Sequence, residues 1–196
     1  MSRTLFDTPL LEPAMRVASR GLLRLLGWQV KGELPPRATR CVVIAAPHTS
    51  NWDLPFMLMA AFVLGMRIRW IGKASIFRPP FGGVMRWLGG IPVHRERSND
   101  LIAASVESLK SAPGPLQLVV APEGTRSRTR QWKAGFHHIA RGAELPILQS
   151  YLDWGTRTCG LGPLVDPTDD VEGDIARIRA FYAPFRGRNV DQFDAG

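Results

Sequence analysis

A histidine and an aspartate five positions apart, His48 and Asp53, are the residue pair best suited to acid–base chemistry. An apolar run, Val42 to Ala46, precedes the pair, and an uncharged segment, Leu54 to Met66, follows it. This order predicts a buried strand, a turn and then a buried helix. Within one helix the two side chains would point about 140° apart, at 3.6 residues per turn. They can meet if His48 lies in the turn and Asp53 caps or opens the helix.

In that arrangement the Asp53 carboxylate can hold one imidazole nitrogen of His48 and stabilise the imidazolium. The other ring nitrogen is then free to act as a general base. The alternative is structural: Asp53 only caps the helix, and His48 only occupies the turn. The pair by itself is compatible with both interpretations.

The composition favours one basic domain. The chain has 196 residues, a formal charge of +8 and ordinary apolar content, which suits a single core and argues against disorder. Arginine supplies 21 of the 25 basic residues, and the excess of positive charge lies in residues 1–160. Arginine binds phosphate with two parallel hydrogen bonds. We therefore expect an anionic partner. The charge alone does not distinguish phosphate groups, an anionic membrane and a nucleic acid.

Metal and disulfide chemistry are not indicated. Cys41 and Cys159 lie far apart in apolar runs, without metal-ligand spacing. His94, His137 and His138 lack the helical spacing and third partner of a metal site. We expect no metal, and we interpret these histidines as surface or packing residues.

The first 40 residues are expected to contain an amphipathic helix over residues 13–26. Arg16, Arg20 and Arg24 repeat every four residues, and the opposite side is apolar: Met15, Ala18, Leu22, Leu25 and Leu26. This pattern is typical of a helix in a membrane interface, and equally of a helix packed on a domain with its arginines in water. Acidic residues near the start argue against a signal peptide, and the longest uncharged stretch is too short to span a membrane. We expect a soluble or peripheral protein.

Strand and helix patterns alternate along the rest of the chain. This predicts the α/β class, with a mixed, mostly parallel central sheet flanked by helices. The expected strands are 41–46, 67–71, 91–95, 116–121, 146–152 and 157–165, and the expected helices after the first are 54–64, 84–88, 98–110, 131–144 and 170–182.

Polar residues follow three of these strands. They are the His48–Asp53 turn, Arg95, and the Glu123–Ser127 turn. Ligands of open α/β sheets bind beyond the strand ends, so a base, a carboxylate and two arginines can converge on one cleft. That combination suits transfer of a group onto a hydroxyl of a phosphate-bearing molecule.

These residues resemble the motifs of the glycerolipid, or lysophospholipid, acyltransferase family. The first block of that family is a histidine, four residues and an aspartate; the second is a glycine, apolar residues and an arginine; the third is a Pro-Glu-Gly-Thr-Arg-Ser turn; and the fourth is an apolar stretch around proline. The matching residues here are His48–Asp53, Gly90–Arg95, Pro122–Ser127 and Leu145–Leu148. Order and spacing both fit over roughly residues 40–150.

The resemblance implies a glycerol-3-phosphate acyltransferase-like fold and an O-acyltransferase. His48, oriented by Asp53, would deprotonate an acceptor hydroxyl, which would attack the thioester of acyl-CoA or acyl carrier protein. The implied substrate-binding residues are Lys73, Arg95, Glu123, Gly124, Thr125 and Arg126. No cofactor is implied beyond the acyl thioester co-substrate. The first acceptor to expect is 1-acyl-sn-glycerol 3-phosphate, followed by glycerol 3-phosphate or another lysophospholipid.

By the same resemblance, residues 1–40 would be an N-terminal helix and connection that can contact a membrane, and residues 41–196 the acyltransferase domain. We expect a cytoplasmic protein, peripherally associated with an anionic membrane surface. A lipid or thioester hydrolase remains an alternative, since Ser50 lies near His48, although the Gly-x-Ser-x-Gly signature is absent. A basic anion-binding module for membrane or nucleic acid is the other alternative. We expect no nucleic acid, because no recognised binding motif is present.

Overall fold

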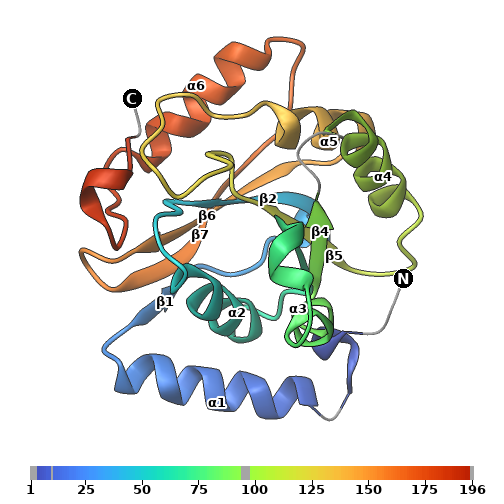
Figure 1. The fold of residues 1–196 in the computed structure, drawn as a ribbon. Helices are drawn as coiled ribbons and strands as arrows, with labels where there is room; N and C mark the ends of the chain where they lie inside the picture. The colour runs from blue at the N-terminus through green and yellow to red at the C-terminus, as the bar shows by residue number, and fades with distance from the viewer. Residues whose placement is uncertain (1–3, 10, 94–97, 195–196) are drawn as a thin grey trace.

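The computed structural model describes residues 4–9, 11–93 and 98–194, and these residues form a seven-stranded sheet with helices on both faces (Figure 1). The strand order is β1-β7-β6-β2-β5-β3-β4. Neighbouring strands are parallel except for β6 and β7. The strands are β1 (Gln29–Lys31), β2 (Arg40–Ala46), β3 (Ile68–Lys73), β4 (Gly90–Val93), β5 (Leu116–Val120), β6 (Ile147–Asp153) and β7 (Thr158–Val165). The prediction of a mixed, mostly parallel sheet flanked by helices is confirmed.

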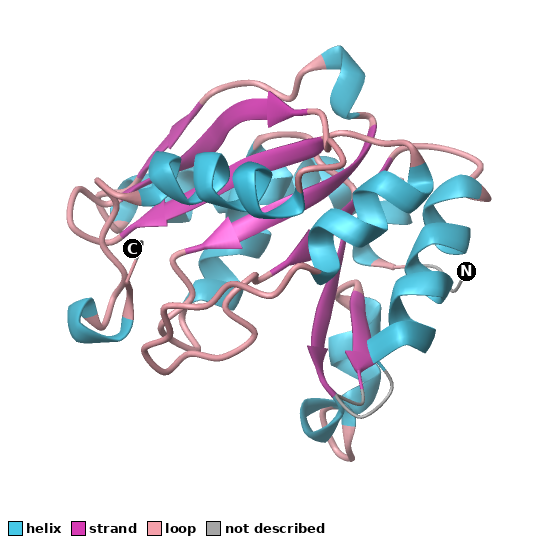
Figure 2. Ribbon diagram, turned by 90° about the horizontal axis from the view of Figure 1, so that it is seen from above, coloured by secondary structure: helices cyan, strands magenta, loops and turns pink. Residues whose placement is uncertain are grey.

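The helices form a layer on each face of the sheet, which is strongly twisted when seen from above (Figure 2). One layer holds α1 (Leu11–Leu25), α2 (Asp53–Val63) and α3 (Gly82–Trp87). The other holds α4 (Ser98–Lys110), α5 (Gly135–Ala143) and α6 (Val171–Tyr182), as Figure 1 shows.

The central strand β2 is buried on both faces, which explains its unbroken apolar sequence. Val42 and Ile44 point into a core formed with α4, α5 and α6. Cys41 and Val43 point the other way, into a core that includes side chains of α2. Because β2 is fixed from both sides, the turn that follows it has a rigid base.

The carboxyl ends of β2, β5 and β3 meet at one edge of the sheet, since these strands are adjacent and parallel. Their last residues are Ala46, Val120 and Lys73. The segments that follow β2 and β5 hold the two polar turns that the sequence singled out. The fold therefore brings those turns side by side.

Besides shifts of a few residues at the ends of other elements, two elements differ clearly from the sequence prediction. A helix was expected over residues 131–144, but α5 begins only at Gly135. Residues 131–134 stay in the preceding loop because the Trp132 side chain is buried and the Lys133 amide donates to the Pro122 carbonyl at 2.8 Å. The short edge strand β1 was not expected, because three residues are too few to show the alternation of a strand.

Helix α1 lies along α2 (Figure 1) and packs on it through Leu23, which shares a buried cluster with Phe56 and Ala60. Leu25 on its other side is 83% exposed, and Val17 is 74% exposed. One face of α1 therefore packs on the domain, which is one of the two interpretations of its arginine repeat. Membrane contact by residues 1–40 stays a prediction. Within the described residues, no helix has the length and apolar character needed to cross a membrane.

Candidate active site

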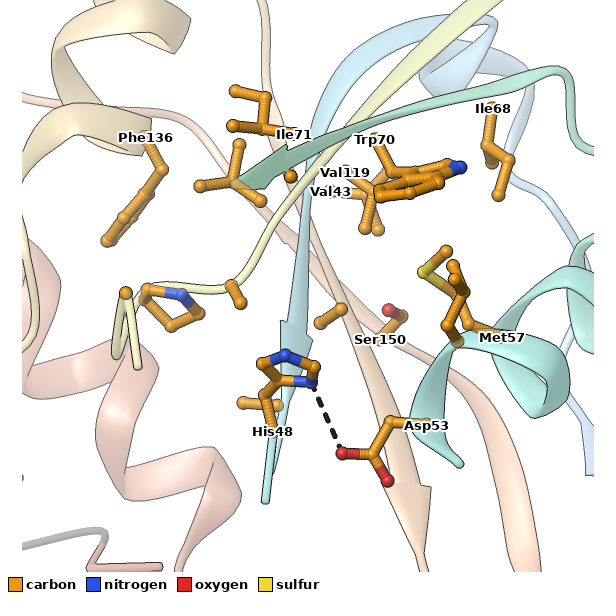
Figure 3. A pocket seen from close by; sticks show the side chains of 18 of the residues that line it. Val43, His48, Asp53, Met57, Ile68, Trp70, Ile71, Val119, Phe136 and Ser150 are labelled. Atoms are coloured by element: carbon orange, nitrogen blue, oxygen red, sulfur yellow. Dashed lines mark ion pairs between the residues drawn. The ribbon is translucent and has the colours of Figure 1, made fainter. Parts of the chain in front are cut away.

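The side chains of His48 and Asp53 meet at the carboxyl end of β2. His48 Nδ1 lies 3.2 Å from Asp53 Oδ2 (Figure 3). His48 belongs to the turn after β2, and Asp53 is the first residue of α2, with Trp52 at the N-cap position. Of the two arrangements that the spacing allowed, Asp53 thus opens the helix and does not cap it.

The Asp53 carboxylate is held on all sides. Its Oδ2 atom accepts hydrogen bonds from the backbone N–H groups of Thr49 (2.9 Å) and Ser50 (2.8 Å). Its Oδ1 atom accepts one from the indole Nε1 of Trp154 (2.9 Å). The Asp53 side chain is 4% exposed and that of His48 is 32% exposed. The carboxylate is therefore buried and fixed, while the imidazole can be reached from the cavity beside it.

A second carboxyl group, Glu123, lies beneath the histidine turn. Its Oε1 atom accepts a hydrogen bond from the backbone N–H of His48 at 3.0 Å. Burial raises the pKa of Glu123 to about 7, against the lowering effect of hydrogen bonds from its own N–H and that of His48; the nearby Asp53 charge adds a smaller increase. Glu123 thus ties the turn after β5 to the turn after β2, and it is not among the residues that line the cavity.

A cavity of about 1170 Å³ opens beside His48. Most of its lining is apolar and comes from β2, β3, β5 and the inner face of α2, including Val43, Met57, Ile68, Trp70 and Val119 (Figure 3). The volume is somewhat larger than the roughly 300–1,000 Å³ of most small-molecule sites. A long apolar substrate can therefore be buried with one end next to the imidazole.

The predicted substrate-binding residues fall in three places. Lys73 and Arg126 are exposed and line the cavity, as do Gly124 and Thr125. Glu123 is buried below the turn, as described above. Arg95 lies outside the described residues, so its predicted role stays a prediction. The structure therefore brings Lys73 and the Gly124–Arg126 turn to the same cavity as His48.

Trp154 is the site residue that sequence reasoning missed. It lies 101 positions after Asp53, just beyond β6, and belongs to none of the motifs. Its ring packs in an aromatic cluster with Trp28 and Phe56, at centroid distances of 5.0 Å each. The one signal in the sequence was a tryptophan directly after a strand that neighbours β2.

Of the other described histidines, one lies in the core and the other, His138, lines the same large cavity as His48. His137 is fully buried, and its Nε2 atom lies 2.8 Å from Asp174 Oδ2, between α5 and α6. His138 is exposed on α5. Within the described part of the chain, no group of three or more His, Cys, Asp or Glu side chains could hold a metal ion.

Comparison with known proteins adds a family to this geometry. A model of the acyltransferase family matches residues 28–152. The chain is 32% identical over 136 residues to a 1-acyl-sn-glycerol-3-phosphate acyltransferase of Salmonella typhimurium and 30% identical over 136 residues to one of Escherichia coli. Each match covers 65% of this chain and 54% of the relative. The chain thus spans about half the length of the curated relatives it matches.

A solved structure has the same fold. The crystal structure of the 1-acyl-sn-glycerophosphate acyltransferase PlsC from Thermotoga maritima superposes with a TM-score of 0.58. The match covers 87% of this chain and 78% of that chain, at 18% sequence identity. At this identity the likeness supports the fold alone.

Proposed function

Because this chain belongs to the acyltransferase family, as its motifs predicted, we propose that it transfers a fatty acyl group to a hydroxyl of a phosphate-bearing glycerolipid. The observation that carries the proposal is the contact between His48 and Asp53 at the mouth of a large, mostly apolar cavity. The first acceptor we propose is 1-acyl-sn-glycerol 3-phosphate, the compound in the names of the relatives. The acyl donor is a thioester, either acyl-CoA or the acylated form of acyl carrier protein.

His48 acts as the general base in this proposal. Because Asp53 Oδ2 is an acceptor and lies 3.2 Å from His48 Nδ1, we assign the proton of the neutral imidazole to Nδ1, which leaves Nε2 free. Nε2 takes the proton of the acceptor hydroxyl as its oxygen attacks the thioester carbonyl. The tetrahedral intermediate collapses, the C–S bond breaks, and the imidazolium returns its proton to the departing thiolate. General-base catalysis of this kind contributes about 10²–10⁴ in rate.

The acyl chain and the phosphate would occupy different parts of the cavity. The apolar walls around Met57, Ile68 and Trp70 suit a fatty acyl chain. Arg126, together with Lys73, offers positive charge for a phosphate group near the opening. Thr125 adds a hydroxyl at the same turn. These roles for the cations follow from their position and charge, and the assay below tests them.

We further propose that the protein works at the cytoplasmic surface of an anionic membrane without crossing it. Helix α1 carries exposed apolar side chains, such as Leu22 and Leu25, and the side chains of Arg20 and Arg24 on the same helix are exposed as well. A second group of exposed apolar side chains surrounds α3, including Phe81 and others of the same stretch: Ile76, Val84 and Trp87. No acidic residue occurs from residue 54 to residue 93, which favours an anionic surface.

The test is acyl transfer from labelled acyl-CoA and acyl carrier protein to a panel of lysophospholipids and glycerol 3-phosphate. We expect acylated product from the wild type, loss of activity in His48→Ala, and a raised KM for the acceptor in Arg126→Ala. Arg37→Ala is the matched control, because Arg37 is exposed and precedes β2 at the opposite end from the site. Free fatty acid without acylated acceptor would identify a hydrolase and overturn the proposal.

A further inference from the structure

The segment after α6 folds back over the histidine turn. The Asn189 side-chain amide donates to the Thr49 carbonyl at 2.8 Å, and its backbone N–H donates to Thr49 Oγ1 at 3.2 Å. Gly187 approaches Thr49 so closely that an added Cβ would lie 2.6 Å from its side chain. Residues 187–189 are thus fixed against the loop that carries His48, although they lie beyond the 28–152 range of the family match.

Arg188 lies in the middle of this segment and is held by two indole rings. Its guanidinium carbon is 5.1 Å from the ring centroid of Trp52 and 5.0 Å from that of Trp154. Both distances are in the range of cation–π contacts. Stacking uses the faces of a guanidinium and leaves the N–H groups at its edge available. Among the described residues, no carboxylate forms an ion pair with Arg188.

Arg188 lines a second pocket of about 450 Å³ beside the histidine turn. Arg126 lines it too, with polar side chains that include Ser50, Asn51 and Ser127. No described acidic residue is part of its lining. Ser50, Asn51, Arg126 and Ser127 also line the large cavity, so the polar pocket continues from the space next to His48.

We propose that Arg188 and Arg126 together form a subsite for a phosphate ester of a substrate. Two guanidinium groups in a pocket whose described lining holds no acidic residue provide the donors and the charge that a phosphate group requires. The pocket adjoins the His48 turn, so a phosphate bound there is close to the reacting hydroxyl. The inference rests on the proposed function for the source of the phosphate, which is either the glycerophosphate of the acceptor or the phosphopantetheine arm of the donor.

Steady-state kinetics of Arg188→Ala, Arg188→Lys and the control Arg186→Ala test the subsite. Arg186 is exposed in the same segment and lines neither pocket. We expect Arg188→Ala to raise KM about 10- to 100-fold, the range of one charge-assisted hydrogen bond. Arg188→Lys should have an intermediate KM, because lysine keeps the charge without the planar fork. Arg186→Ala should match the wild type.

The substrate whose KM rises identifies the source of the phosphate. A rise for the acceptor alone assigns the subsite to the glycerophosphate, and a rise for the donor alone assigns it to phosphopantetheine. A fall in kcat without a change in either KM would overturn the proposal, because it would mean that Arg188 only supports Trp154 and, through it, Asp53.

A binding measurement separates this inference from the proposed function. Inorganic phosphate and glycerol 3-phosphate are titrated into the purified wild type, Arg188→Ala and Arg186→Ala, and heat is recorded by calorimetry. Phosphate binding that weakens at least tenfold in Arg188→Ala alone supports the subsite even if no acyl transfer is found. Equal binding by wild type and Arg188→Ala overturns it even if acyl transfer is established.

Discussion

The indole Nε1 of Trp154 donates a hydrogen bond of 2.9 Å to Asp53 Oδ1, so a residue just after β6 fixes the first residue of α2. The other carboxylate oxygen accepts from the backbone of Thr49 and Ser50 and lies 3.2 Å from His48 Nδ1. Each oxygen of Asp53 thus has its own donors, and the carboxylate cannot turn without losing one. The orientation of the His48 ring therefore depends on Trp154.

Trp154→Phe should lower kcat for acyl transfer while KM for both substrates stays nearly unchanged. The phenyl ring can keep the packing with Trp28 and Phe56, but Asp53 Oδ1 loses its donor. We expect kcat to fall about 10- to 100-fold through misplacement of the base. The free energy of unfolding should drop by about 1–3 kcal/mol, the cost of an unpaired buried acceptor. Steady-state kinetics and urea unfolding measure both effects.

Trp132→Phe is the matched control for this prediction. Trp132 is also buried, but its indole nitrogen has no hydrogen-bond partner among the described residues. The substitution removes the same N–H group without removing a hydrogen bond. An equal loss of kcat in both variants would mean that the Trp154–Asp53 bond has no special role.

Glu123→Gln should change how stability depends on pH. Burial raises the pKa of Glu123 from an ordinary value of 4.5 to about 7, so the folded protein holds a proton that the unfolded chain has lost between these pH values. The wild type is therefore destabilised as pH rises through this window, by at most about 3 kcal/mol at 1.36 kcal/mol per pKa unit. Glutamine can still accept from the His48 N–H and carries no charge. The variant should gain stability relative to wild type between pH 5 and pH 8.

Urea unfolding at pH 5, 6, 7 and 8 measures this difference. Glu172→Gln, at an exposed acidic residue of α6, is the control and should show no such trend. A constant difference between Glu123→Gln and wild type across the series would show that Glu123 does not titrate in this window.

The approach of His48 to Asp53 could be predicted because both lie within six residues at the junction of a strand and a helix. Local geometry at such a junction follows from the apolar pattern on either side. The adjacency of the Glu123 turn was also predictable, since parallel strands bring their carboxyl ends to one edge of the sheet. The direction of the Glu123 side chain could not be predicted, because its hydrogen-bond partner is a backbone N–H, which every residue except proline offers.

Trp154 and Arg188 could not be found from the sequence. Each of them lies more than 100 residues after the residue of the histidine turn that it contacts, Asp53 for Trp154 and Trp52 for Arg188. Neither belongs to a spaced motif. Helix α1 shows a different limit. Its arginine repeat fitted both packing and membrane contact, and the structure packs one face through Leu23 while leaving Leu22 and Leu25 exposed. An amphipathic pattern gives the faces of a helix but not the partner of each face.

Asp174→Asn should destabilise the protein at neutral pH. Burial acts to raise the pKa of Asp174, but hydrogen bonds from Thr168, His137 and Arg177 lower it from 3.8 to about 2. The ionised Asp174 carboxylate therefore stabilises the fold fully above about pH 4, and this contribution is lost as pH falls from about 4 to about 2. We expect the free energy of unfolding at pH 7 to fall by about 1–3 kcal/mol, since asparagine keeps only one of the two acceptor oxygens that these donors use. The difference in unfolding free energy between Asp174→Asn and the wild type should become smaller as pH falls towards 2.

Asp169→Asn is the control for Asp174→Asn. Asp169 is exposed and pairs with Arg141 at the surface, where an ion pair is worth about 0–1 kcal/mol. Chemical unfolding of both variants at pH 7 and pH 2.5 separates the buried from the exposed carboxylate. A gap between Asp174→Asn and wild type that persists at pH 2.5 would contradict the assigned titration.

Gly124→Ala should distort the turn that presents Thr125 and Arg126. Gly124 has φ +61°, a conformation that costs an alanine about 1–2 kcal/mol. An added Cβ would also lie 2.8 Å from the Lys133 side chain, which would have to move. We expect a loss of unfolding free energy of that size and a raised KM for the acceptor. Gly114→Ala is the control, because a Cβ there meets no atom within 4 Å. If both variants keep the wild-type KM, Arg126 does not depend on the conformation of Gly124 to bind the acceptor.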